Sequence, residues 1–267
     1  MSKIISQQLK DPLSMFDVSG QTAVVTGASG AFGRGISITL GALGANVMLA
    51  SGSEEELNGV AEEIREVGGQ AETIVRRPDS LEDAEAIRDA ALKKFGSIKM
   101  LAIGSGYNKA GFIHEMDYQD WQDVMDANVR GAWFMAKAIG SYWIENDVRG
   151  KVVLMSSVRG RHGNISGYCA SKGATDSLTR VLATEWAKHG ITVNAIAPTV
   201  FRSKLTAWMY GDDELGQATK ARSLSRIPLG RLGEVEDLTG MALYLLSPAS
   251  DFCTGQIMYV DGGYTAG

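Results

Sequence analysis

Short apolar runs alternate with longer amphipathic stretches from residue 21 to the end of the chain, and this alternation restricts the possible folds most. Short runs rich in apolar and β-branched residues are typical of buried strands in a parallel sheet, and the stretches between them are long enough for crossover helices. The pattern predicts an α/β fold with a doubly wound parallel seven-stranded sheet. The expected strands are Thr22–Thr26, Asn46–Ala50, Ala71–Val75, Lys99–Ile103, Lys151–Ser156, Thr192–Ile196 and Gln256–Val260.

The stretches between these strands predict helices within a single domain. A chain of 267 residues with 45% hydrophobic content can fill one core, and no linker rich in proline, glycine or serine divides it. We expect residues 1–17 to form a surface arm, residues 18–267 to form the domain, and the charged and aromatic segment 200–228 to form a lid, since long insertions in compact domains are usually binding loops. The expected helices are Glu54–Val67, Leu81–Phe95, Trp121–Glu145, Gly167–His189 and Glu234–Leu246.

Charge and composition narrow the possible partners. The formal net charge is −5, and an acidic chain lacks the positive field that nucleic acid or an anionic membrane surface needs. Two cysteines cannot form a disulfide framework, and three histidines without a cluster at ligand spacing predict no metal site. No stretch reaches the roughly 18 apolar residues of a membrane span. These features favour a cytoplasmic protein that acts on a small-molecule substrate, with no nucleic-acid or membrane partner.

A glycine-rich turn joins the first predicted strand to a helical stretch, Arg34–Leu43. The turn reads Thr26-Gly27-Ala28-Ser29-Gly30-Ala31-Phe32-Gly33. Glycines at such a junction let the backbone fold tightly and approach a pyrophosphate, which lies on the free N–H groups of the helix N-terminus. The context therefore predicts a Rossmann-type domain that binds a dinucleotide at this turn.

Four further segments carry a resemblance to a known family. They are Tyr168-Cys-Ala-Ser-Lys172, Asn194-Ala-Ile-Ala-Pro198, Arg226-Ile-Pro-Leu-Gly-Arg-Leu-Gly233 and Thr254-Gly-Gln-Ile-Met-Tyr-Val-Asp-Gly-Gly263. Together with the glycine turn, they resemble the short-chain dehydrogenase/reductase family, in its short single-domain branch that includes 3-oxoacyl reductases and gluconate dehydrogenases. The resemblance implies an NAD(P)-dependent oxidoreductase that interconverts a secondary alcohol and a ketone by hydride transfer.

The predicted catalytic residues are Asn128, Ser157, Tyr168 and Lys172. A phenol with a pKa near 10 exchanges protons poorly at neutral pH, and Lys172 lies four residues after Tyr168 on the same helix face, where an ammonium group favours the phenolate. Ser157 follows the fifth strand, so it would hydrogen-bond the substrate oxygen, with Ser156 as the alternative. The resemblance assigns to Lys172 a hydrogen bond with the nicotinamide ribose and to Asn128 the support of a water relay.

The expected cofactor is NADP or NAD, with a lean to NADP. The second strand ends without the acidic residue that holds the ribose 2′-hydroxyl of NAD, and Ser51 and Ser53 can accept either sugar. Arg34, Arg76 and Arg77 are the candidates for neutralising a 2′-phosphate. The predicted cofactor-binding residues are Gly27, Ser29, Gly30, Ala31, Phe32, Gly33, Ser51, Gly52, Ser53, Arg77, Ser105, Gly106, Tyr168, Lys172, Pro198, Val200 and Ser203.

Three departures from the family pattern leave other functions open. The turn has Ala31 where the family has its second glycine, Ile103-Gly104-Ser105-Gly106 replaces the family's Asn-Asn-Ala-Gly, and Arg77 replaces an aspartate near the adenine. A Rossmann domain that has lost efficient cofactor binding and serves as a binding or regulatory subunit is therefore one alternative. A dehydratase or epimerase that uses bound cofactor is the other.

Substrate contacts are expected from Ser157, Arg159, Arg161, Tyr168 and Trp208. The two arginines follow Ser157 on the side of the sheet where substrate lies, and a guanidinium can hold a carboxylate bidentately. We therefore expect an anionic substrate, such as a hydroxy or keto acid or a sugar acid, with a polyol as the neutral alternative. The resemblance and the apolar C-terminal segment after the last strand predict a homotetramer or homodimer.

Overall fold

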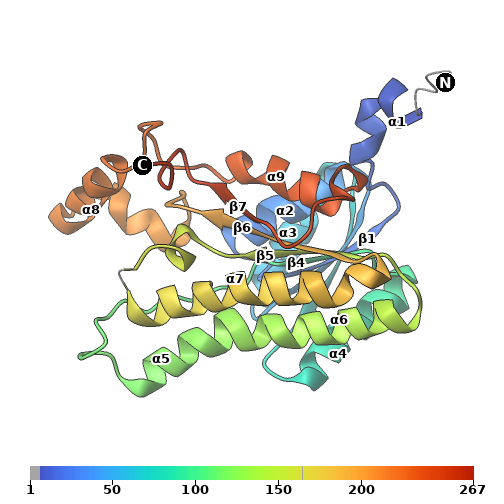
Figure 1. The fold of residues 1–267 in the computed structure, drawn as a ribbon, viewed down its shortest axis with the longest axis horizontal. Helices are drawn as coiled ribbons and strands as arrows, with labels where there is room; N and C mark the ends of the chain where they lie inside the picture. Colours follow the sequence, from blue (N-terminus) through green and yellow to red (C-terminus); the bar gives the residue numbers. More distant parts are fainter. Residues whose placement is uncertain (1–6, 164) are drawn as a thin grey trace.

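The computed structural model describes residues 7–163 and 165–267, and a parallel sheet of seven strands forms its centre (Figure 1). The strand order is β3-β2-β1-β4-β5-β6-β7, so the order reverses between the first and fourth strands. In doubly wound sheets, ligands bind at the carboxyl ends of the strands beside such a reversal. The strands are β1 (Thr22–Thr26), β2 (Asn46–Ser51), β3 (Gln70–Val75), β4 (Met100–Ile103), β5 (Lys151–Met155), β6 (Thr192–Pro198) and β7 (Ile257–Val260).

The predicted fold class is confirmed, and each strand lies within about two residues of its expected bounds. The apolar runs are strands because both faces of the sheet are covered. Every residue of β1, β4 and β6 is buried. Continuous burial explains why these segments are uniformly apolar instead of alternating between apolar and polar residues.

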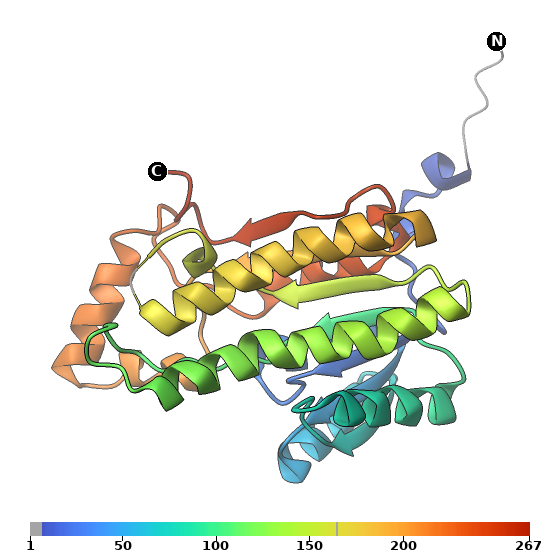
Figure 2. The same ribbon diagram turned by 60° about the horizontal axis from the view of Figure 1, so that its bottom comes forward.

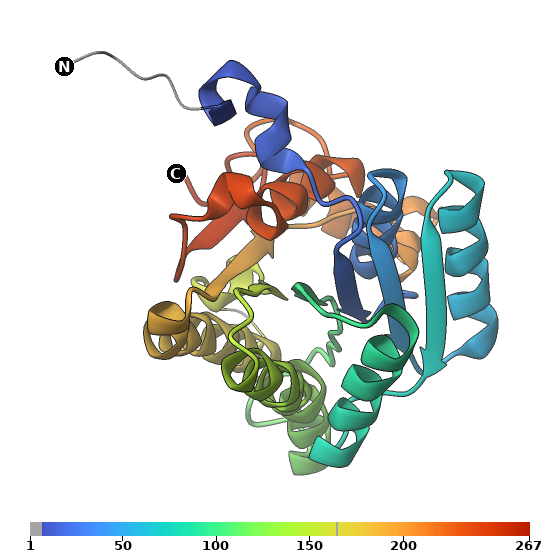
Figure 3. The same ribbon diagram turned by 90° about the vertical axis from the view of Figure 1, so that its right-hand side faces the viewer.

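Helices cover both faces of the sheet, as Figures 2 and 3 show. Two buried apolar clusters join the helices to the sheet, one on each face. Apolar side chains recur on the inward face of each helix, which holds it against the strands. The helices are α2 (Ala31–Ala42), α3 (Glu54–Glu66) and α9 (Glu236–Leu246) on one face, and α4 (Leu81–Phe95), α6 (Gly131–Glu145) and α7 (Ser166–Trp186) on the other.

The helix expected over Trp121–Glu145 is not a single regular helix. It consists of α5 (Tyr118–Met125), a π-helical turn (Asp126–Arg130) and α6. The wider turn interrupts the regular hydrogen-bond ladder at Asn128, whose side chain is hydrogen-bonded to the backbone of Tyr107. Such turns commonly occur where a helix carries a functional residue.

The predicted lid segment contains helices of its own, a 3₁₀ helix (Lys204–Tyr210) and α8 (Glu214–Leu224). In Figures 1 and 2, α8 lies at the carboxyl ends of the strands.

The described part of the predicted arm forms α1 (Gln7–Lys10) and a short 3₁₀ helix (Pro12–Phe16), and α1 projects away from the body at the opposite end (Figure 1). Residues 1–6 of the arm lie outside the described residues. Within residues 7–163 and 165–267, no helix is long and apolar enough to span a membrane.

Candidate active site

Gly27 and Gly33 allow close backbone contacts at the turn after β1, which packs directly against the turn after β4. Gly27 has φ of +63°, and a Cβ atom built on it would lie 2.5 Å from the backbone nitrogen of Ser105. A Cβ atom built on Gly33 would lie 2.3 Å from the carbonyl oxygen of Gly27. A side chain at position 27 would push the two turns apart, and a side chain at position 33 would push the start of α2 away from Gly27. The glycine pattern is therefore a steric requirement of the point where the strand order reverses.

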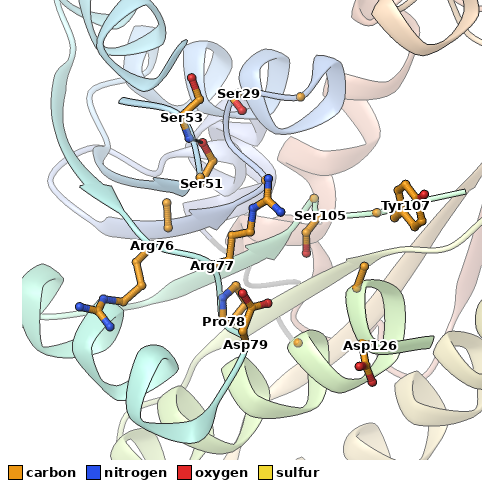
Figure 4. Close-up of a pocket in the computed structure, with 18 of the residues that line it drawn as sticks. Ser29, Ser51, Ser53, Arg76, Arg77, Pro78, Asp79, Ser105, Tyr107 and Asp126 are labelled. Carbon is orange, nitrogen blue, oxygen red and sulfur yellow. Dashed lines mark hydrogen bonds between the residues drawn. The ribbon is translucent and has the colours of Figure 1, made fainter. Parts of the chain in front are cut away.

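A cleft of about 710 Å³ opens at this point (Figure 4). Helix α2 begins just after Gly30 without a side-chain cap, so the N–H groups of its first turn are free for an anion. The buried hydroxyl of Ser105 also lacks a hydrogen-bond partner among the described residues. These groups suit the pyrophosphate and sugars of a dinucleotide. The predicted residues that line the cleft are Gly27, Ser29, Gly30, Ser51, Gly52, Ser53, Arg77, Ser105 and Gly106.

The remaining predicted residues of the turn and lid lie beside this lining. Phe32 packs edge-on against Phe201, with ring centres 5.3 Å apart, and so joins the turn to the base of the lid. Ser203 forms a capping box with Thr206 at the start of the 3₁₀ helix. Pro198 ends β6 and is buried, and Val200 packs in the small apolar cluster under the lid. Ala31 and Gly33 belong to the first turn of α2.

Tyr168 and Lys172 lie one turn apart on α7. Lys172 is 3% exposed, its Nζ donates a hydrogen bond of 2.8 Å to the carbonyl oxygen of Met155, and the same atom lies 5.5 Å from the centre of the Tyr168 ring. A Cβ atom built on Gly106 would lie 3.7 Å from Lys172 Nζ. Gly106, which lines the cleft, therefore lies next to the buried Nζ of Lys172.

Burial controls the protonation of this pair. Desolvation lowers the pKa of Lys172 to about 8, although the negative charge of Asp176 opposes the fall. Desolvation raises the pKa of Tyr168, and a hydrogen bond with Ser157 opposes that rise. The pKa of the phenol is therefore raised overall, and the groups that oppose the rise are Ser157 and Arg159. That Lys172 favours the phenolate stays a prediction.

Asn128 fixes the loop that follows β4. Its side chain accepts a 2.7 Å hydrogen bond from the backbone N–H of Tyr107 and donates one of 2.9 Å to the carbonyl oxygen of the same residue. A third bond, from Nδ2 to the hydroxyl of Ser171, ties this loop to α7. Asn128 therefore holds Gly106 in place beside Lys172.

The two candidate serines have different partners. The hydroxyl of Ser156 is buried and donates to the carboxylate of Asp176. The hydroxyl of Ser157 is hydrogen-bonded to Tyr168, accepts from the backbone N–H of Arg159 at 3.2 Å and lies 3.4 Å from the carbonyl oxygen of Pro198. Only Ser157 is thus placed beside the phenol.

Asp176 is a site residue that we did not predict from the sequence. It is 6% exposed, and it lies four residues after Lys172 on the same helix face. Burial raises its pKa, while Ser156, Arg180 and Lys172 all act in the opposite direction. The regular spacing of Tyr168, Lys172 and Asp176 was a signal in the sequence that could have identified it.

The predicted substrate residues differ in their exposure. Arg159 is half-buried and close enough to Tyr168 for its charge to lower the pKa of the phenol, and the residues described here offer it no ion pair. Arg161 is exposed, and its charge acts on Tyr259. Trp208 is exposed at 49% on the lid. Of the two arginines, Arg159 is the one placed near the phenol.

An ion pair that sequence reasoning missed joins the lid to the rim of the cleft. Lys204 Nζ donates a 2.8 Å hydrogen bond to Glu56 of α3, and Glu56 is also hydrogen-bonded to Ser29 of the glycine turn. The two partners are separated by 148 positions in the chain, so no local pattern indicates this contact.

Comparison with known proteins agrees with this geometry. A family model described as Enoyl-(Acyl carrier protein) reductase matches residues 27–265. An oxidoreductase of uncharacterized activity from Mycobacterium tuberculosis is 48% identical over 258 residues, which cover 95% of this chain and 94% of that protein. Gluconate 5-dehydrogenase from Gluconobacter oxydans is 34% identical, with 94% of this chain and 97% of that protein covered.

Solved structures show the same architecture. A protein from Agrobacterium tumefaciens described as a 2-deoxy-D-gluconate 3-dehydrogenase, solved with bound NADP, has a TM-score of 0.87 and 32% identity, with 95% of this chain and 99% of that chain covered. The fold and the cleft define an enzyme of the NAD(P)-dependent oxidoreductase class. Within that class, the chain belongs to the short-chain dehydrogenase/reductase family, as the sequence motifs indicated.

Proposed function

We propose that this enzyme interconverts the secondary alcohol and the ketone of a hydroxy or keto acid, such as a sugar acid. The observation that carries the proposal is the half-buried guanidinium of Arg159, which has no ion pair among the described residues and lies beside the phenol of Tyr168. A cation that is partly desolvated and unpaired is costly unless it has an anionic ligand. The names of two similar proteins support the same class, since gluconate and 2-deoxygluconate are both carboxylates.

Bound NAD(P) supplies or accepts the hydride in such a reaction. The protein's part is to place the substrate and to move one proton. Tyr168 donates its phenolic proton to the carbonyl oxygen during reduction and takes it back during oxidation. The hydroxyl of Ser157 is hydrogen-bonded to the phenol of Tyr168, so it can bind the same substrate oxygen and hold it beside the phenolic proton.

Lys172 compensates for the charge that Tyr168 gains when it gives up its proton. In this structure, Nζ is bonded to the carbonyl oxygen of Met155 and lies beside the tyrosine ring. A lysine with a pKa of about 8 remains mostly charged at neutral pH, so it favours the phenolate at the moment the phenolate forms. Asn128 contributes by holding the loop that borders Lys172.

Arg159 has a defined role in this proposal. Its guanidinium binds the substrate carboxylate and thereby orients the neighbouring carbinol carbon, because a planar fork holds a carboxylate in one plane. A neutral substrate of the same shape would gain nothing from this contact. Arg159 therefore sets the preference for acids, whereas Tyr168 and Lys172 set the rate for any substrate.

The test is the variant Arg159→Ala, with Arg161→Ala as the matched control from the same loop. We expect Arg159→Ala to lower kcat/KM for an aldonic acid or hydroxy acid by about tenfold to hundredfold, the effect of a lost charge-assisted hydrogen bond, and to change kcat/KM for the corresponding polyol by less than about threefold. Arg161→Ala should change neither value by more than about threefold.

Two results would contradict the proposal. One is an equal loss on the acid and the polyol in Arg159→Ala, and the other is a wild-type enzyme that prefers the polyol. Product analysis completes the experiment, because an oxidoreductase forms one reduced nicotinamide for each ketone. A dehydratase or epimerase would leave the nicotinamide balance unchanged.

A further inference from the structure

Gly52 and Arg77 occupy adjoining positions at the adenosine end of the cleft. Ser51, the last residue of β2, is paired in register with Val75, the last residue of β3, so the chain leaves both strands at the same edge. A Cβ atom built on Gly52 would lie 2.5 Å from Arg77 Nε, 3.0 Å from Nη2 and 3.1 Å from Cζ. The guanidinium of Arg77 therefore lies where a Cβ atom at position 52 would be, and it would have to move if that position carried a side chain.

Arg77 differs from the other arginines near this end of the cleft. Arg34 is bound by Glu63, Arg76 by Asp83 and Arg130 by Asp126. Arg77 has no ion pair among the residues that the structure describes. In Figure 4, its side chain points between Ser51 and Ser105. Arg76 also lines the cleft, but its guanidinium is directed away from Arg77 and is paired with Asp83.

The surroundings of Arg77 suit a phosphate. The hydroxyls of Ser51 and Ser53 line the same end of the cleft and can each contribute a hydrogen bond. Two carboxylates also line this end. Glu56 is already paired with Lys204, and Asp79 is exposed and follows Arg77 in the same turn. Arg77 is therefore the unpaired cation among hydroxyls that a phosphate monoester would select.

We propose that Arg77 binds the 2′-phosphate of NADP(H), and that position 52 is glycine because the arginine reaches the site from β3 instead of β2. The proposal deepens the proposed function, since it concerns the cofactor of the same enzyme. It predicts that NADP(H) is preferred over NAD(H). It also predicts that an arginine at position 52 and an arginine at position 77 are alternatives that cannot both fit.

The first test measures binding alone and needs no substrate. Isothermal titration with adenosine 2′,5′-bisphosphate and with adenosine 5′-monophosphate separates the 2′-phosphate from the rest of the nucleotide. We expect Arg77→Ala to weaken binding of the bisphosphate by about tenfold to hundredfold, because charge-assisted hydrogen bonds are lost. Binding of the monophosphate should weaken by less than about threefold. Retained monophosphate binding also shows that the variant is folded. The matched control, Arg76→Ala, should change neither affinity by more than about threefold.

The second test exchanges the two positions. Gly52→Arg alone should not tighten the bisphosphate, because two guanidinium groups would compete for one volume and repel each other. The double variant Gly52→Arg with Arg77→Gly should restore bisphosphate affinity to within about fivefold of the wild type. Gly52→Arg would then tighten bisphosphate binding only when Arg77 has been replaced, which is the result expected if the two positions share one site.

Three outcomes would overturn the proposal. Equal weakening of both nucleotides in Arg77→Ala would show that Arg77 stacks on the adenine instead of binding the 2′-phosphate. If Arg76→Ala weakened bisphosphate binding as much as Arg77→Ala, the phosphate would be attracted by the overall positive charge at this end of the cleft and not bound by Arg77. Additive effects in the double variant would show that the two positions do not share a site. None of these results depends on which alcohol the enzyme oxidises, so the substrate proposal can fail independently.

Discussion

Replacing Lys172 with methionine should make the cofactor-free protein more stable while abolishing its activity. The buried ammonium is costly to the fold, since its pKa falls from an ordinary 10.5 to about 8. At about 1.4 kcal/mol for each pH unit, this fall corresponds to about 3 kcal/mol against the charged form. Methionine fills a similar volume and carries no charge.

Two losses offset part of that gain. The carbonyl oxygen of Met155 loses its 2.8 Å hydrogen bond from Nζ, which costs about 1 kcal/mol, and the buried carboxylate of Asp176 loses a favourable charge nearby. The expected net gain is about 1–2 kcal/mol at pH 7. For a chain of this size, that gain raises the melting temperature by about 2–8 °C.

The pH dependence identifies the cause. Below about pH 8, Lys172 is charged in both the folded and unfolded chains, so the wild type bears the full cost of the buried charge. Between about pH 8 and 10.5, the folded chain has lost the proton and the unfolded chain has kept it, so wild-type stability rises with pH relative to the variant. The stability advantage of Lys172→Met should therefore shrink from pH 7 to pH 10.

Thermal unfolding followed by circular dichroism, at pH 7 and at pH 10, measures both quantities. Lys188→Met is the matched control, because Lys188 is exposed near the end of the same helical segment. This substitution should change the melting temperature by less than about 2 °C. A variant that melts below the wild type at pH 7, or an advantage that does not change with pH, would refute the reasoning that the buried charge destabilises the fold.

Two further predictions concern the chemistry and the assembly. Tyr168→Phe should lower kcat by about 10²–10⁴-fold with little change in nucleotide affinity, as measured by turnover and titration, because the phenol transfers a proton; a loss below about tenfold would remove Tyr168 from the mechanism. We expect a homotetramer or homodimer in sedimentation velocity at micromolar concentration, since Trp133 and Val181 expose apolar surface on α6 and α7, and a monomer would contradict this expectation.

The sequence predicts the fold well because the information for the sheet is local. Each strand is a short, buried apolar run, and the glycine turn lies between a strand and a helix, so its place in the fold follows directly. The pairing of Tyr168 with Lys172 is equally local, since four residues separate neighbours on one helix face. These features need no knowledge of distant contacts.

The details that sequence reasoning left open depend on contacts between distant segments. Ser156 and Ser157 are adjacent in sequence, and only the position of Asp176 decides that Ser156 turns away from the phenol. The directions of Arg76 and Arg77 depend on which of them meets Asp83. The balance of burial and charge at Tyr168 likewise depends on the packed structure.

The position of β1 between β2 and β4 affects how the chain folds during synthesis. β1 acquires one neighbour early, but its other neighbour ends at Ile103, so the centre of the sheet stays open until that residue has left the ribosome. Until then, an apolar strand has an unpaired edge, which is a template for association with other chains. A nascent chain stalled before Ile103 should therefore depend on chaperones, whereas a longer one can bury this strand within its own sheet.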